Sequence, residues 1–186
     1  MLEQIASFDQ HVLAILYAKR DMAVLLPLTD VTQLGSVIAV FLVGGALALI
    51  LALHQRIAEM VGLTIALVGT AVSSSFLKDV FARPRPDLAY QAYAETGYSF
   101  PSEHTSLATA LSVYVVYLVY RLSPSYAVRT IAFCLGIIVI TGVGFSRLYL
   151  GVHYVSDVIA GAILGALLAG IGIMIERSLE RFNLKK

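Results

Sequence analysis

Five long apolar stretches restrict what this chain can fold into more than any other feature of its sequence. A helix that crosses the hydrocarbon core of a bilayer needs about 20 apolar residues. The stretches that approach this length cover residues 33–53, 57–77, 104–121, 126–146 and 157–175. Because lipid offers no partner to exposed backbone groups, each stretch is predicted to be a transmembrane helix. The predicted fold class is all-α, an integral membrane helical bundle with about five transmembrane helices.

The composition agrees with a membrane protein and excludes other classes. The 186 residues are 59% hydrophobic and 13% charged, whereas about a quarter of a typical soluble protein is charged. The net charge of +1 gives no reason to expect nucleic acid as a partner. Cys134 is the single cysteine, so no internal disulfide can form. The N-terminal sequence MLEQIASFDQ lacks the pattern of a cleaved signal peptide, so we expect none.

The N-terminal segment, residues 1–30, is predicted to lie on the membrane surface. Apolar residues recur there at helical spacing, at Ile5, Phe8, Val12, Ile15 and Leu16. This periodicity is typical of an amphipathic interfacial helix. The MAVLLPL sequence that follows is too short to span, and Pro27 interrupts it. We expect one domain over residues 1–186, ending in a cytoplasmic tail at 176–186.

Small residues on the predicted spans would let the helices approach closely in lipid. They are Gly44, Gly45, Ala48, Gly62, Ala66, Gly69, Gly161, Gly165 and Ala169. The GAILG sequence at 161–165 could mediate dimerisation, but packing within the bundle is the preferred interpretation.

The connection 78–103 is the one long polar segment, and it is predicted to be an active-site loop. It holds three of the five prolines, so it cannot continue the helices beside it. Its aromatic residues suit the headgroup level of a membrane: Tyr90, Tyr93, Tyr98 and Phe100. If every apolar stretch crosses once, this loop and the 147–157 junction emerge on the same face.

The junction carries a histidine and a carboxylate four residues apart, His153 and Asp157. On a helix this spacing places both on one face, within hydrogen-bonding reach. The carboxylate would fix the imidazole tautomer and leave the other ring nitrogen free as a nucleophile or base. Arg147 precedes them near the turn. Such pairs are often structural, but ionisable groups at a membrane boundary favour a functional role.

Two further segments supply anion-binding groups. FPSEHT, residues 100–105, opens a predicted helix whose first amides attract anions, and Ser102 could donate its hydroxyl there or simply cap the helix. His104 adds a titratable group. In KDVFARPRP, residues 78–86, prolines on both sides stiffen the backbone that carries Arg85, as an anion clamp requires. Lys78 could instead merely snorkel to the headgroups, and Arg83 and Arg85 could hold lipid phosphates without specificity. Together these groups match the needs of phosphoryl transfer.

On these residues the chain resembles the type 2 phosphatidic acid phosphatase (PAP2) family, whose superfamily includes the vanadium haloperoxidases. The first family motif is matched by Lys78, Arg85 and Pro86. The second is matched by Pro101, Ser102 and His104, with Glu103 in place of the usual glycine. The third is matched by Ser146, Arg147, His153 and Asp157. The glycine lets the backbone approach the phosphate, so the Glu103 side chain is expected to point away and leave its amide available.

The resemblance implies a mechanism. His153 would attack phosphorus and become phosphorylated, Asp157 would orient it, and His104 would protonate the leaving oxygen and then activate water. The phosphate would be held by Lys78, Arg85, Ser102, Glu103 and Arg147. No cofactor or metal is implied, since cationic side chains take the role that magnesium has elsewhere.

The basic residues predict the orientation of the chain. The face opposite the motifs carries Arg56, Arg121, Arg129, Arg177, Arg181, Lys185 and Lys186. Apart from the presumed catalytic cations, the motif face carries Lys19, Arg20 and Arg83. Because cytoplasmic loops are enriched in Lys and Arg, we expect a cytoplasmic C-terminus and an active site on the extracytoplasmic face of the cell membrane.

The expected partners are a lipid phosphate or diphosphate substrate and the surrounding membrane lipids. An outward-facing site suits recycling of undecaprenyl diphosphate, a cell wall lipid carrier, and an acidic residue at position 103 also occurs in some polyprenyl diphosphate phosphatases. Hydrolysis of phosphatidylglycerophosphate or phosphatidic acid is the alternative. A small transporter or channel subunit is a distant alternative, because the polar residues gather at one face instead of lining a path through the spans.

Overall fold

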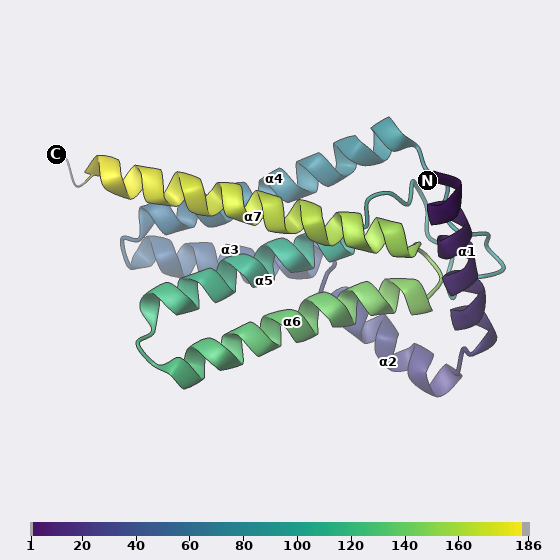
Figure 1. Ribbon diagram of the computed structural model, residues 1–186. Coiled ribbons are helices and arrows are strands. Elements are labelled where there is room, and N and C mark those ends of the chain that lie inside the picture. The colour runs from purple at the N-terminus through teal and green to yellow at the C-terminus, as the bar shows by residue number, and fades with distance from the viewer. Residues whose placement is uncertain (1, 184–186) are drawn as a thin grey trace.

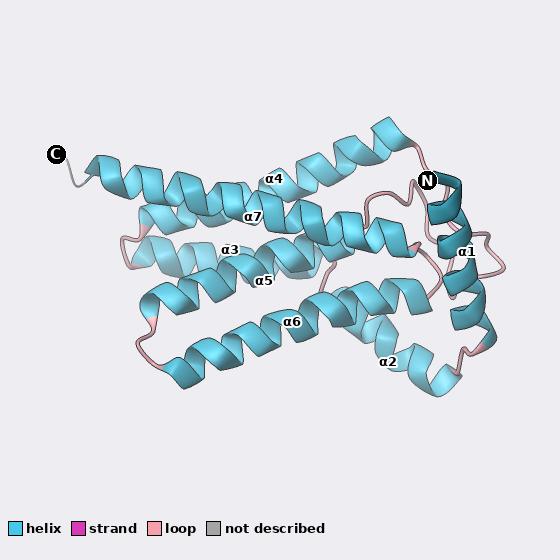
Figure 2. Ribbon diagram, in the orientation of Figure 1, coloured by secondary structure: helices cyan, strands magenta, loops and turns pink. Residues whose placement is uncertain are grey.

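The computed structural model describes residues 2–183, and within that range every regular element is a helix (Figure 1 and Figure 2). The helices are α1 (Leu2–Ala18), α2 (Met22–Gln33), α3 (Val37–Leu53), α4 (Ile57–Phe81), α5 (Glu103–Leu122), α6 (Tyr126–Tyr149) and α7 (Val155–Asn183). Four of them, α4 to α7, are long and apolar enough to cross a membrane, and α2 with α3 forms a fifth candidate span that is bent by 44°. The predicted all-α bundle is therefore confirmed.

The first predicted span, residues 33–53, starts too early. α3 begins at Val37, and α2 precedes it as a separate helix. The sequence predicts an interruption at Pro27, but this proline lies inside α2. Asp21 caps α2 by accepting the Ala23 N–H at 2.8 Å, so the helix begins five residues before Pro27. Because proline has no N–H, the helix lacks one backbone hydrogen bond at this position. The bend comes later, where Ser36 caps α3 by accepting the Ala39 N–H at 3.2 Å.

The later helices extend beyond the predicted boundaries, α4 and α7 the furthest. α4 continues through Lys78 to Phe81, so the active-site connection is residues 82–102. Ala82 caps the end of α4 in a left-handed conformation (φ 43°), and Pro84, two residues later, cannot continue the helix. At the other end of the chain α7 runs to Asn183, so residues 176–183 of the expected tail are helical. Lys185 and Lys186 lie outside the described residues.

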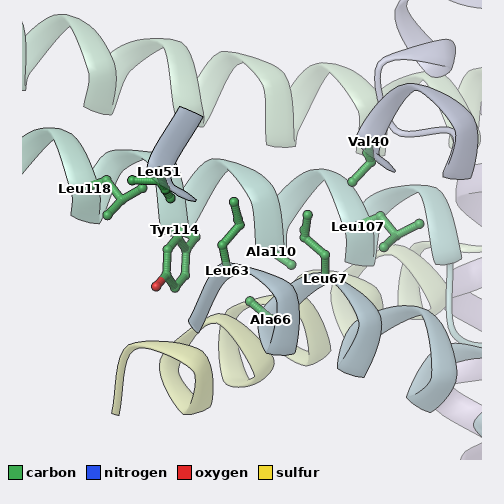
Figure 3. Packing of buried hydrophobic residues seen from close by; sticks show 9 residues of the cluster. All are labelled: Val40, Leu51, Leu63, Ala66, Leu67, Leu107, Ala110, Tyr114 and Leu118. Atoms are coloured by element: carbon green, nitrogen blue, oxygen red, sulfur yellow. The ribbon is translucent and has the colours of Figure 1, made fainter. Parts of the chain in front are cut away.

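The apolar core lies between α3, α4 and α5 (Figure 3). It consists of Val40, Leu51, Leu63, Ala66, Leu67, Leu107, Ala110, Tyr114 and Leu118. α7 packs closely against α5, because a Cβ at Gly161 would lie 2.6 Å from the Ser102 carbonyl oxygen and one at Gly165 would clash with the Ser106 carbonyl. The interpretation of GAILG as an internal packing surface is confirmed. This close seam brings the start of α5 against the start of α7.

α1 runs across the end of the bundle at which α4 ends and α7 begins (Figure 1). Some of its apolar residues face outward, with Ile5 42% and Phe8 56% exposed, whereas Leu13 packs against the protein and is 4% exposed. Asp9 is also buried, being only 1% exposed. The amphipathic helix predicted from the sequence is present, and one of its acidic residues faces the protein.

Candidate active site

The three motifs meet at the end of the bundle that α1 and the 82–102 connection cover (Figure 1). α4 contributes Lys78 from its last turn, α6 contributes Arg147 from its last turn, and α7 contributes Asp157 from its first turn. Gly151 makes the turn between α6 and α7 possible, since it has a positive φ of 69° and lies too close to the Tyr90 carbonyl for any Cβ. The convergence predicted by counting the spans is therefore present.

His153 is the buried centre of the site, with 2% of its surface exposed. Its Nδ1 lies 3.4 Å from Asp157 Oδ2, and its Nε2 lies 3.1 Å from Nη1 of Arg85. The predicted contact with Asp157 is present, although His153 lies in the junction ahead of the helix, because α7 begins only at Val155. Asp157 Oδ2 accepts the Tyr154 N–H at 2.9 Å, so the carboxylate caps the helix start and reaches back to the imidazole.

The electrostatics of the site keep His153 neutral. Burial, followed by the charges of Arg147 and Arg85, lowers the pKa of the imidazole well below its usual value. A neutral ring whose Nδ1–H faces Asp157 carries its lone pair on Nε2. That nitrogen is the one directed at Arg85, as a nucleophile for a bound phosphate requires.

Arg85 is held rigidly, as its flanking prolines predict. Its Nε donates to the carbonyls of Thr96 and Gly97, both at 3.2 Å, and its Nη1 donates to the Val152 carbonyl at 3.0 Å. These bonds to backbone oxygens fix the guanidinium beside His153 Nε2. The expectation of a preset clamp agrees with this geometry.

Arg147 is fully buried and keeps one donor unused. Its Nη1 donates to Thr32 Oγ1 at 3.1 Å and to the Tyr93 hydroxyl at 2.8 Å. Its Nη2 pairs with Glu95, whose other carboxylate oxygen lies 3.2 Å from Arg85 Nη2. The Nε of Arg147 is buried without a hydrogen-bond partner. A carboxylate from the 82–102 connection thus bridges the two arginines of the predicted phosphate site.

The second motif differs in detail from the sequence prediction. Ser102 is fully buried. Its N–H donates to the Asp157 carbonyl at 3.0 Å, and its hydroxyl lies 3.0 Å from Thr105 Oγ1 without capping α5. The Glu103 side chain was expected to point away from the phosphate site. Instead its Oε2 pairs with Nζ of Lys78 at 3.2 Å. Opposite charges at this distance attract each other, so the Glu103 carboxylate is held at the lysine.

His104 is the predicted acid–base group, and it sits in the first turn of α5. It is close enough for the charges of Arg147, Glu95, Lys78 and Arg85 to act on it. The residues assigned from the sequence thus gather at one end of the bundle, and their catalytic and phosphate-binding roles stay predictions.

Three groups that sequence reasoning missed also belong to the site: Asp9, Arg83 and Glu95. Arg83, considered above as a non-specific lipid contact, donates to Asp157 Oδ1 at 2.5 Å and to Asp9 Oδ2 at 2.8 Å. A signal for Asp9 was present, because on a helix it stacks with Leu13, four residues later, which the structure also buries. No sequence signal distinguished Glu95 from the other acids of the connection.

One group of carboxylates outside the site has the spacing of metal ligands. Among the described residues, Glu59, Glu176 and Glu180 bring their oxygens within 4.8 Å of one another at the opposite end of the bundle. Arg121 pairs with Glu176 and Glu180, and Arg56 pairs with Glu59 at 2.6 Å. Because these two arginines offset most of its negative charge, the cluster is explained as an ion-pair network.

Comparison with known proteins places this geometry in a family. Residues 59–179 match the PAP2 superfamily. Phosphatidylglycerophosphatase B of Bacillus subtilis is 35% identical over 111 residues, which cover 59% of this chain and 54% of that protein. An undecaprenyl-diphosphatase of Sulfolobus acidocaldarius is 36% identical over 81 residues, which cover 44% of this chain and 35% of that protein. The chain thus spans about half or less of the length of these relatives.

A solved structure extends the likeness to nearly the whole chain. The crystal structure of a transmembrane PAP2-type phosphatidylglycerolphosphate phosphatase from Bacillus subtilis matches with a TM-score of 0.82 and 26% identity, over 96% of this chain and 89% of that chain. Together with the apolar helices, this match indicates a multi-pass membrane protein. The superfamily match contains all three motifs and more than half of the residues, so this chain belongs to the PAP2 superfamily.

Proposed function

We propose that the protein is a membrane lipid phosphatase that works through a phosphohistidine at His153. The observation that carries the proposal is the neutral imidazole, whose Nδ1 faces Asp157 and whose Nε2 faces Arg85. A phosphate bound by Arg85 and Arg147 would have its phosphorus next to that lone pair. In-line attack needs this arrangement of nucleophile and cationic donors.

The reaction has two steps. Nε2 attacks phosphorus, the N–P bond forms, and the bond to the leaving oxygen breaks as His104 gives that oxygen a proton. Neutral His104 then takes a proton from water, whose oxygen attacks phosphorus, and inorganic phosphate leaves as the N–P bond breaks. Charge on the phosphoryl oxygens is balanced throughout by Lys78, Arg85 and Arg147, with the Ser102 hydroxyl and the Glu103 amide beside them.

For the substrate we propose a polyprenyl diphosphate such as undecaprenyl diphosphate, with phosphatidylglycerophosphate or phosphatidic acid as the alternative. The relatives support both choices, since one is named an undecaprenyl-diphosphatase and another a phosphatidylglycerophosphatase. Three cations around one site favour the more highly charged diphosphate.

For the orientation we propose an extracytoplasmic site and a cytoplasmic C-terminus in the cell membrane. The support is the excess of Lys and Arg on the face opposite the motifs, seven against three once the three phosphate-binding cations are set aside.

The decisive experiment is phosphate release by the purified protein from a panel of lipids, with and without EDTA. We expect the highest kcat/KM with undecaprenyl diphosphate and no effect of the chelator. A higher value with phosphatidylglycerophosphate or phosphatidic acid would replace the substrate assignment by its alternative. Activity that EDTA removes and magnesium restores would contradict the reliance on cationic side chains.

A further inference from the structure

We propose that Asp9 and Arg83 are positioning residues for the nucleophile, so that the surface helix α1 is part of the catalytic machinery. The inference rests on the proposed function, because it concerns how Asp157 is held against His153. Neither residue belongs to the phosphate site, and both act through Asp157.

Arg83 determines which oxygen of Asp157 is available to the histidine. Its Nη1 donates to Oδ1 at 2.5 Å, while Oδ2 faces His153 Nδ1 at 3.4 Å and accepts the Tyr154 N–H at 2.9 Å. Arg83 therefore binds one carboxylate oxygen while His153 and the Tyr154 N–H contact the other, and these contacts together fix the plane of the carboxylate. Asp157 is fully buried, and a buried carboxylate needs such a partner to stay charged.

Arg83 is in turn held by α1. Asp9 Oδ2 accepts from Arg83 Nη2 at 2.8 Å, and Asp9 Oδ1 accepts the Ser156 N–H at 3.0 Å. The Ser156 hydroxyl bonds to Asp9 and accepts from Arg83 Nη1 at 2.7 Å. The Tyr154 ring lies under the guanidinium, 4.3 Å from its carbon. Every neighbour of Arg83 in this cluster is thus fixed by α1 or by the start of α7.

The burial of Asp9 is the anomaly that this role explains. A charged side chain on a surface helix is normally solvated, yet Asp9 is 1% exposed while its neighbour Phe8 is 56% exposed. A carboxylate used only to fasten α1 would affect stability alone. A carboxylate that holds Arg83 on Asp157 must also affect the chemical step.

The kinetic signature follows from the geometry. Misplacing the nucleophile should slow formation of the phosphoenzyme with every leaving group, whereas the phosphate contacts of Arg85 and Arg147 stay intact. We expect Asp9→Asn and Arg83→Gln to lower kcat by about 10²-fold, the typical cost of a misplacement of about 1 Å. KM, and the inhibition constant of inorganic phosphate, should stay within about twofold of wild type, since the groups that bind phosphate are unchanged.

The experiment compares these variants with Glu3→Gln, which removes an exposed acid from the same helix. Turnover and rapid-quench phosphohistidine formation are measured with a lipid phosphate and with nitrophenyl phosphate. Asp9→Glu and Arg83→Lys supply variants that keep the charge if the others fail to fold. Arg83→Lys should recover only part of the rate, because an ammonium cannot bridge two carboxylates as a planar guanidinium does.

Two results would overturn the inference. One is wild-type kcat in folded Asp9→Asn and Arg83→Gln, or, where these do not fold, wild-type kcat in Arg83→Lys. The other is a raised KM with unchanged kcat, which would place the cluster in substrate binding. Absence of phosphohistidine in the wild-type protein would instead contradict the proposed function, so the two failures are distinguishable.

Discussion

The position of Glu95 predicts how strongly one substitution should change the affinity of the site for phosphate. The Glu95 carboxylate occupies donors of Arg85 and Arg147 that a substrate phosphate would need, and so it acts as an internal competitor for the phosphate. Burial alone would raise the pKa of Glu95, but Arg147 and Arg85 more than offset burial and lower the pKa below its usual value. Glu95 is therefore ionised at neutral pH, and an incoming phosphate has to displace it.

The magnitude can be worked out from the two ion pairs. Hydrogen bonds to charged groups contribute about 1.5–3 kcal/mol each when well buried. The Glu95 side chain is 21% exposed and regains hydration when it leaves, so we take the net cost of displacing it as about 1–2 kcal/mol in total. Removing the charge in Glu95→Gln should therefore tighten phosphate binding roughly 5- to 30-fold.

The assay is competitive inhibition of lipid phosphate hydrolysis by inorganic phosphate at neutral pH. We expect the inhibition constant to fall by this factor in Glu95→Gln. Asp87→Asn is the matched control, because Asp87 is an exposed acid of the same connection that bonds to the Ala89 N–H at 2.9 Å. An inhibition constant that is unchanged or higher in Glu95→Gln, relative to this control, would refute the reasoning.

Three further predictions concern pH, the two histidines and the topology. Since the pKa of Glu95 is lowered, the difference between wild type and Glu95→Gln should persist to unusually acidic pH and vanish only as the carboxylate protonates; a difference that disappears near pH 6 in parallel inhibition assays would contradict this. His153→Ala should abolish turnover and phosphoenzyme formation with every substrate. His104→Ala should lose roughly 10²–10⁴-fold in rate, and nitrophenyl phosphate should recover part of that loss because its leaving group needs little protonation. Phosphate found on His104 by mass spectrometry would reverse the assignment of nucleophile and acid. Leu88 is 68% exposed, so the cysteine of Leu88→Cys in a Cys134→Ala background should react with an impermeant thiol reagent in intact cells. Protection of this cysteine would invert the proposed orientation.

The sequence predicted the bundle and the motif residues because both depend on local patterns. Apolar length gives the spans, and the number of crossings brings Lys78, Arg147 and Asp157 to one end. The placement of His153 was harder, since the i,i+4 spacing cannot tell a helical pair from a histidine that precedes a helix capped by the aspartate. The start of α3 was missed because the Ser36 cap and the preceding bend carry no hydropathy signal.

Glu95 and Arg83 could not be assigned for a different reason. Their partners lie 52 and 74 residues away in the chain, on α6 and α7. Which acid of a polar connection reaches an arginine depends on the path of the backbone, and here turns and bonds to backbone oxygens, such as those of Arg85, define that path. No residue pattern within the 82–102 connection encodes those distant contacts.

The position of α1 has a consequence for handling the protein outside its native bilayer. This helix is held to the bundle by the Asp9 cluster and by a bond from Gln10 to the Tyr154 hydroxyl at 3.3 Å, and its apolar side is left for lipid. The α5–α7 seam, in contrast, is closed by backbone contacts at Gly161 and Gly165 that no lipid supports. Solubilisation should therefore loosen α1 before it disturbs the transmembrane helices, and an enzyme purified in harsh detergent would be folded but slow. Returning it to vesicles or nanodiscs should restore its turnover without refolding.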